Sequence, residues 1–116
     1  MTKKRISELY RFLAVASMKR LTDEEKVAFI RLLRKMKPVF TEIHDAANDA
    51  LEQAKKESQD QSAVFALVEK SMQDLSQQEC DCDIRVMNDE MFNRLCLSND
   101  WSFAQIDELE AELVIG

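Results

Sequence analysis

Glycine and proline are almost absent from this sequence of 116 residues, which contains one of each, Gly116 and Pro38. Because glycine adopts positive φ more readily than any other residue, the chain has few positions suited to tight turns. This scarcity excludes a glycine-rich phosphate-binding loop, a dinucleotide-binding GxGxxG turn and a GxSxG nucleophile elbow. It also argues against a sheet of tight hairpins, whose turns usually need glycine. We therefore predict an all-α fold.

The sequence also has no long apolar run, and its three cysteines are an odd number. No stretch approaches the roughly 18 to 20 apolar residues of a membrane span. Basic residues at 3–5 resemble the start of a signal peptide, but Glu8 and Arg11 interrupt the apolar stretch that would follow. Three cysteines fit reduced thiols better than a disulfide framework. We expect a single cytoplasmic domain over residues 1–116 that has no contact with a membrane.

Metal-binding and catalytic patterns are weak. Cys80, Cys82, Cys96 and His44 supply the donor atoms that zinc prefers, but CxC is not the usual CxxC spacing. His44 is the only histidine, and its neighbour Asp45 points about 100° away around a helix. We expect partly buried thiols, no metal, no cofactor and no catalytic residue, and hence a protein that is not an enzyme.

One long helix is the clearest prediction. Thr22 and Glu25 have the spacing of a capping box, and acidic residues fill the first turn that follows. Apolar residues then recur at alternating spacings of 4 and 3, at Phe29, Leu33, Met36, Phe40, Ile43, Ala47, Ala50 and Ala54. Such a repeat of 3.5 residues is typical of helices that pack on other helices, as in a coiled coil. It predicts one helix over residues 23–57 whose apolar stripe is an interaction surface.

Pro38 lies inside this repeat, where it removes a backbone donor and crowds the carbonyl of Arg34. Because the apolar phase continues across Pro38, we predict a kink and not a chain reversal. A helix over residues 23–57 would measure about 52 Å, whereas a compact chain of this size has a diameter of roughly 35 Å. Three explanations remain open: an elongated molecule, a sharp bend, or a second copy that covers the protruding part.

A second helix is expected to fold back on the long one. The stretch at 58–61 is polar, and the apolar residues after it no longer follow the earlier repeat. This change of phase predicts a loop and then a helix over residues 62–77, antiparallel to the first.

Shorter helices are expected near both ends of the sequence. One covers about residues 6–18, and a second one begins near Asn88 or Asp89 and ends near residue 98, after a segment at 84–86 that could be extended. A final helix over residues 103–114 is preceded by Ser102, which has Gln105 three residues later, as in a capping box. The expected architecture is a long kinked helix in an antiparallel hairpin or bundle, with these short helices packed around it.

Charge is distributed unevenly along the chain. Residues 1–37 carry a net charge of +7, residues 38–116 carry −13, and the total is −6. The basic segment at 3–37 supplies candidate phosphate contacts: Lys4, Arg5, Arg11, Lys19, Arg20, Arg31, Arg34 and Lys35. The same asymmetry also fits attraction between two halves of one fold or between copies arranged head to tail. Because the whole protein is acidic and repels phosphate at long range, we favour these latter explanations.

The order of elements resembles small uncharacterised helical proteins that phages and prophages encode. The resemblance rests on the sequence Ile-Ser-Glu-Leu-Tyr-Arg-Phe-Leu at 6–13, on the long charged helix from Asp23, and on the closing segment that ends with residues 113–115. It implies a non-enzymatic accessory or assembly protein and carries no functional residues over. We therefore predict a protein that binds protein partners and forms homo-oligomers, with nucleic-acid binding by residues 3–37 as the alternative.

Overall fold

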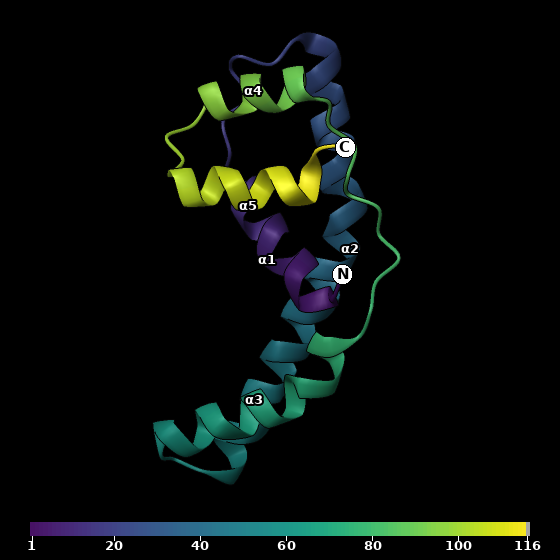
Figure 1. The fold of residues 1–116 in the computed structure, drawn as a ribbon. Helices are drawn as coiled ribbons and strands as arrows, with labels where there is room; N and C mark the ends of the chain where they lie inside the picture. The colour runs from purple at the N-terminus through teal and green to yellow at the C-terminus, as the bar shows by residue number, and fades with distance from the viewer. Residues whose placement is uncertain (116) are drawn as a thin grey trace. The chain divides into compact units, whose positions relative to one another are not determined.

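Helices make up 72% of the chain in the computed structural model, which describes residues 1–115 (Figure 1). The all-α prediction is confirmed, since the β-type pairing within these residues is limited to two isolated bridges. The helices are α1 (Lys3–Leu13), α2 (Asp23–Glu57), α3 (Gln61–Gln77), α4 (Asp89–Leu97) and α5 (Phe103–Leu113).

The long helix α2 begins and continues as the sequence predicts. The Glu25 backbone N–H donates to Thr22 Oγ1 at 3.2 Å, and the Thr22 N–H donates to Glu25 Oε1 at 3.0 Å, which completes the capping box. Pro38 lies inside α2, and the helix continues to Glu57. The continuous apolar repeat therefore identified a single helix correctly, while the kink at Pro38 stays a prediction.

The chain forms two compact units, each built from two separate stretches. The hairpin unit contains residues 1–11 and 37–81, and the core unit contains residues 12–36 and 82–116. Both α1 and α2 contribute residues to both units. The single domain expected from the sequence stays a prediction.

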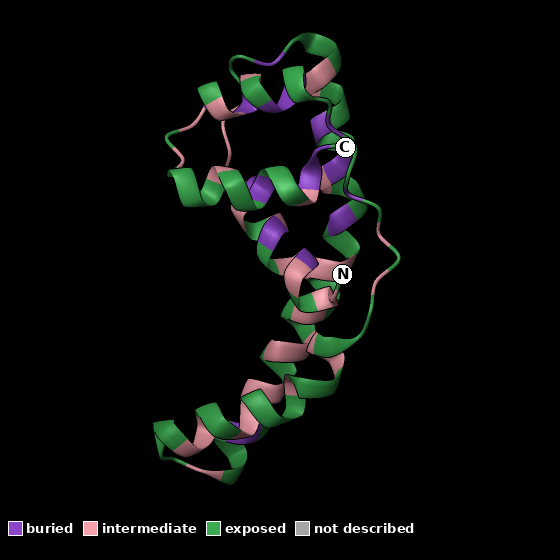
Figure 2. Ribbon diagram, in the orientation of Figure 1, coloured by how far each residue is buried: buried purple, intermediate pink, exposed green. Residues whose placement is uncertain are grey.

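The core unit contains most of the buried apolar side chains (Figure 2). They come from the end of α1, the first half of α2, α4, α5 and the segments between them: Leu13, Leu21, Phe29, Leu32, Met36, Ile84, Met87, Met91, Phe92, Leu95, Leu109, Leu113 and Val114. Polar contacts fix the connection before α2, because the Asn99 side chain accepts from the Ser17 N–H at 2.8 Å and donates to the Ser17 carbonyl at 3.0 Å. These hydrogen bonds hold the connection between α1 and α2 against the segment that follows α4.

The hairpin unit is built on α3, which runs antiparallel along the second half of α2 (Figure 1). A short loop joins them, and Asp60 caps α3 by accepting from the Ser62 N–H at 3.3 Å. The start of α1 is tied to the segment after α3, since the Lys3 N–H donates to the Gln78 carbonyl at 2.9 Å. Only Ile6, Leu9 and Ala54 are buried apolar residues in this unit, all of whose residues are described.

The ends of α1 differ from the prediction of residues 6–18. The helix begins at Lys3, because Thr2 accepts from the Arg5 N–H at 3.2 Å through its hydroxyl and so acts as a cap. It ends at Leu13 because the backbone of Ser17 is held by Asn99 and leaves the helical path. The other boundaries agree closely: α3, α4 and α5 begin or end within one residue of the predicted positions.

Candidate protein-interaction surface

An apolar groove lies between α2 and α3 near the loop that joins them. We call it the hairpin groove; it has a volume of about 760 Å³. Its lining residues are Ala47, Asn48, Leu51, Lys55, Ser58, Gln59, Gln61, Val64, Phe65 and Val68. Ala47, Leu51 and Lys55 lie one turn apart on α2, and Gln61, Phe65 and Val68 lie one turn apart on α3. The groove is therefore formed by two helical faces side by side.

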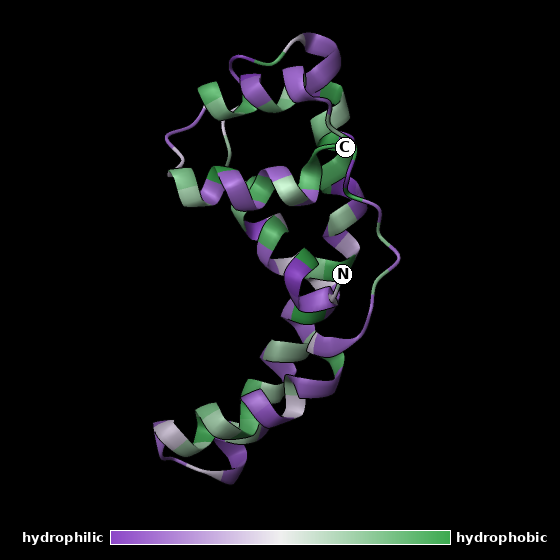
Figure 3. Ribbon diagram, in the orientation of Figure 1, coloured by the Kyte–Doolittle hydropathy of each residue, from purple (hydrophilic) through white to green (hydrophobic). Residues whose placement is uncertain are grey.

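Helix α3 has an apolar face that is only partly covered. Hydrophobic residues recur along its whole length (Figure 3), yet none of its residues, all described, is buried (Figure 2). Phe65 is 66% exposed, while Val64, Val68 and Met72 are half-buried. Burying a large apolar side chain stabilises a protein by about 1.5 to 3 kcal/mol. A partner that covers this face would therefore gain more free energy than one that covers an ordinary polar surface.

The lining of the hairpin groove has almost no charge. Lys55 is the one charged side chain in its lining, and the remaining polar residues are three amides and a serine. The hairpin unit that surrounds it has a net charge of −3, and its part from residue 38 to residue 81 has a net charge of −7. An anionic ligand would meet repulsion there, whereas an apolar helix would not.

The predicted apolar stripe on α2 packs mainly within the chain. In the core unit Phe29 and Met36 are buried and Leu33 is half-buried. In the hairpin unit Ala54 is buried, and the half-buried members are Phe40, Ile43, Ala47 and Ala50. Ala47 alone among the stripe residues lines the hairpin groove.

Sequence reasoning placed Phe65 and Val68 on a helix but did not identify them as site residues, although the change of apolar phase near residue 58 marked the face on which they lie.

His44 lies in an aromatic group on the hairpin unit. Its ring stacks on Phe40 at 5.5 Å, and Phe40 also contacts the Tyr10 ring at 4.8 Å. The guanidinium of Arg11 lies 5.9 Å from the centre of the Phe40 ring. His44 Nε2 is 3.4 Å from the Asn48 side-chain amide. His44 is therefore an exposed residue whose ring contacts Phe40 and whose side chain lies near Asn48, a lining residue of the hairpin groove.

The candidate phosphate contacts are spread over both units. Lys4, Arg5 and Arg11 belong to the hairpin unit, where Arg5 pairs with Glu8 at 3.4 Å. The core unit contains Lys19, Arg20, Arg31, Arg34 and Lys35, all with exposed side chains. Lys35 donates to the Asp83 carbonyl at 2.6 Å. The eight candidate residues are therefore divided between the two units.

The cysteines are half-buried thiols. Cys82 Sγ lies 3.9 Å from the Lys35 carbonyl, and burial raises the pKa of the Cys96 thiol. Within residues 1–115, no three His, Cys, Asp or Glu side chains come together as metal ligands.

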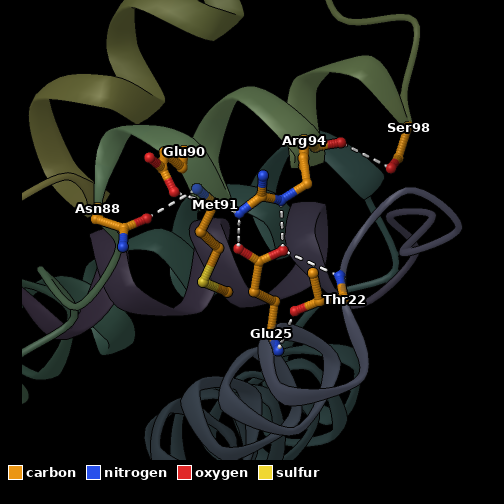
Figure 4. A network of polar contacts seen from close by, with 7 residues as sticks. All are labelled: Thr22, Glu25, Asn88, Glu90, Met91, Arg94 and Ser98. Atoms are coloured by element: carbon orange, nitrogen blue, oxygen red, sulfur yellow. Dashed lines mark hydrogen bonds and ion pairs between the residues drawn. The ribbon is translucent and has the colours of Figure 1, made fainter.

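A bidentate ion pair joins α2 to α4 in the core unit (Figure 4). Arg94 donates to both carboxylate oxygens of Glu25, from Nε at 2.7 Å and from Nη2 at 2.5 Å. The hydrogen bonds from Arg94 lower the pKa of Glu25 to about 2, and the capping contact from Thr22 acts in the same direction. Sequence analysis missed this pair because the two residues are 69 positions apart. The pair fixes the core unit and does not contribute to the hairpin groove.

No helix among the described residues has the length and apolar character needed to cross a membrane. Comparisons of the chain with protein-family models, with curated proteins and with solved structures find no match.

Proposed function

We propose that this protein is a non-enzymatic assembly protein that acts by associating with protein helices, including those of its own copies. The observation that carries the proposal is the hairpin groove, which is apolar and has a volume of about 760 Å³. It lies beside α3, and none of the residues of α3, all described, is buried. The resemblance to phage and prophage accessory proteins supports an assembly role.

The stability of α3 depends on how much of its apolar face is buried. Helices in proteins gain most of their stability from burying an amphipathic face, not from intrinsic propensity. α3 is 17 residues long and covers part of its apolar side on α2, while Phe65 stays largely in water. Two antiparallel helices with an open apolar side are half of a four-helix bundle. A partner that supplies further helices would complete it.

Light scattering on the purified full chain tests this proposal. We expect the molar mass to rise above the 13.5 kDa of one chain as concentration increases. A mass of one chain at all concentrations up to about 1 mM would refute self-association, because even a millimolar dissociation constant would then be excluded.

Nucleic-acid binding is the second candidate, and the core unit supplies the observation in its favour. Lys19, Arg20, Arg31 and Arg34 are exposed, and no acidic side chain pairs with any of them among the described residues. Arg31 and Arg34 are three residues apart on α2, so they project from one side of the helix. Two such neighbouring cations can contact phosphate groups, although the net charge of −6 opposes the approach.

A further inference from the structure

We infer that the hairpin groove receives Phe65 from a second copy of this chain, in a closed dimer with two-fold symmetry. The two hairpins would then form a four-helix bundle in which each Phe65 packs on Leu51 and Ala47 of the other copy. The inference rests on the proposed function and specifies the partner and the contact.

A two-fold interface requires one surface that is complementary to itself. The hairpin groove meets this requirement because it contains both a hollow and a projection. Ala47, Leu51, Val64 and Phe65 all line the groove, and Phe65 is 66% exposed, so we infer that its ring is available to enter the groove of a second copy. A two-fold rotation places the projecting ring of each copy over the hollow of the other. The small side chain of Ala47 leaves room for an aromatic ring to approach α2.

Charge favours this surface over the others for contact between copies. Each copy has a net charge of −6, so two copies repel each other when charged faces meet. The lining of the hairpin groove has one charged side chain, Lys55, at its border with the loop. Contact through the groove therefore brings together a part of each acidic hairpin whose lining contains a single charged side chain.

The size of the groove limits the strength of the contact. From Ala47 to the end of α2 it is about 15 Å long, and two helices packed about 10 Å apart present a face about 20 Å wide. Such a face measures about 300 Å² on each copy, or about 600 Å² for the pair, which is below the roughly 1,000 Å² of a stable interface. We therefore expect a weak dimer, with a dissociation constant above the micromolar range.

The test compares two phenylalanine positions in the full chain by sedimentation equilibrium. Phe65→Glu introduces a charge at the groove, and Phe103→Glu makes the same change at a residue that is 86% exposed in the core unit. We expect the wild-type mass to level off at two chains, Phe65→Glu to weaken the dimer at least about tenfold, and Phe103→Glu to change it little. Because salt screens the repulsion between two copies of net charge −6, association through the groove should stay constant or strengthen as salt rises, whereas head-to-tail attraction between the basic and acidic segments would weaken.

Each outcome has a distinct meaning. A dimer that Phe65→Glu leaves intact would overturn the inferred contact but not self-association, and a mass that grows beyond two chains would overturn the closed two-fold arrangement. A wild-type monomer throughout would overturn self-association itself. If Phe65→Glu loses helical circular dichroism, the variant does not fold and the wild-type protein is tested by NMR. The methyl chemical shifts of Leu51 should then change with protein concentration, while those of Leu109 should not. Leu51 shifts that stay constant would overturn the contact.

Discussion

Replacing Glu25 by glutamine tests the contact that joins α2 to α4. The glutamine side chain retains an oxygen that can accept from the Thr22 N–H, so the capping box survives while the charge opposite Arg94 is lost. The change therefore isolates the ion pair from the helix cap.

The structure sets the size of the effect. Lowering the pKa of Glu25 from 4.5 to about 2 corresponds to at most about 3.4 kcal/mol, at about 1.36 kcal/mol for each pH unit. The Glu25 side chain is 13% exposed but that of Arg94 is 35% exposed, so water screens part of the attraction. We expect the substitution to lower the free energy of unfolding by about 1 to 2 kcal/mol at neutral pH.

The pH dependence follows from the direction of this shift. A carboxylate with a lowered pKa in the folded state stabilises the fold fully above its unfolded value of 4.5 and loses this contribution as the pH falls through about 2. The difference in the free energy of unfolding between wild type and Glu25→Gln should therefore fall, by about pH 3, to less than half of its value at neutral pH. Urea denaturation followed by the fluorescence of Trp101, whose ring lies 5.3 Å from Phe12 in the core unit, measures it.

Glu24→Gln is the matched control, because Glu24 is exposed and also lies in the first turn of α2. It should change stability by less than about 0.5 kcal/mol. Equal effects of the two substitutions, or a gap for Glu25→Gln that is the same at about pH 3 as at pH 7, would refute the assigned role of the Arg94 contact.

Three further predictions concern the core unit and the second candidate function. Phe29→Ala should lower the free energy of unfolding by about 3 to 5 kcal/mol in urea denaturation, because it empties a fully buried site, whereas Phe103→Ala should change it by less than about 0.5 kcal/mol. Ser102→Ala removes the capping box of α5 and should cost about 1 kcal/mol in the same assay. If the chain binds duplex DNA at low salt, replacing Arg31 and Arg34 by glutamate should abolish retention, and a lack of wild-type retention at low salt would eliminate this candidate.

Local signals in the sequence identified most of the fold. The capping boxes at Thr22 and Ser102 appear in the structure as predicted, because each depends on residues only three positions apart. The unbroken apolar repeat across Pro38 likewise identified α2 as one helix. The end of α1 was predicted too late, because the contact between Ser17 and Asn99 that ends it joins residues 82 positions apart.

The candidate surface was only partly predictable for a related reason. A periodic stripe shows that a helix packs against something, but not whether the partner belongs to the same chain. Phe29 and Ala54 prove to be buried within the chain, while Phe65, on a shorter and less regular stripe, remains exposed. Which face stays uncovered depends on how the helices pair, and the sequence pattern does not contain this information.

Amide hydrogen exchange in α3 at low and high protein concentration tests the central claim most directly. If a partner copy covers the hairpin groove, the α3 amides should exchange more slowly at high concentration, because local opening then requires dissociation. The α5 amides serve as the internal reference, since this helix belongs to the core unit and should exchange at a concentration-independent rate. Equal α3 exchange rates across the range from micromolar to about 1 mM would contradict the account.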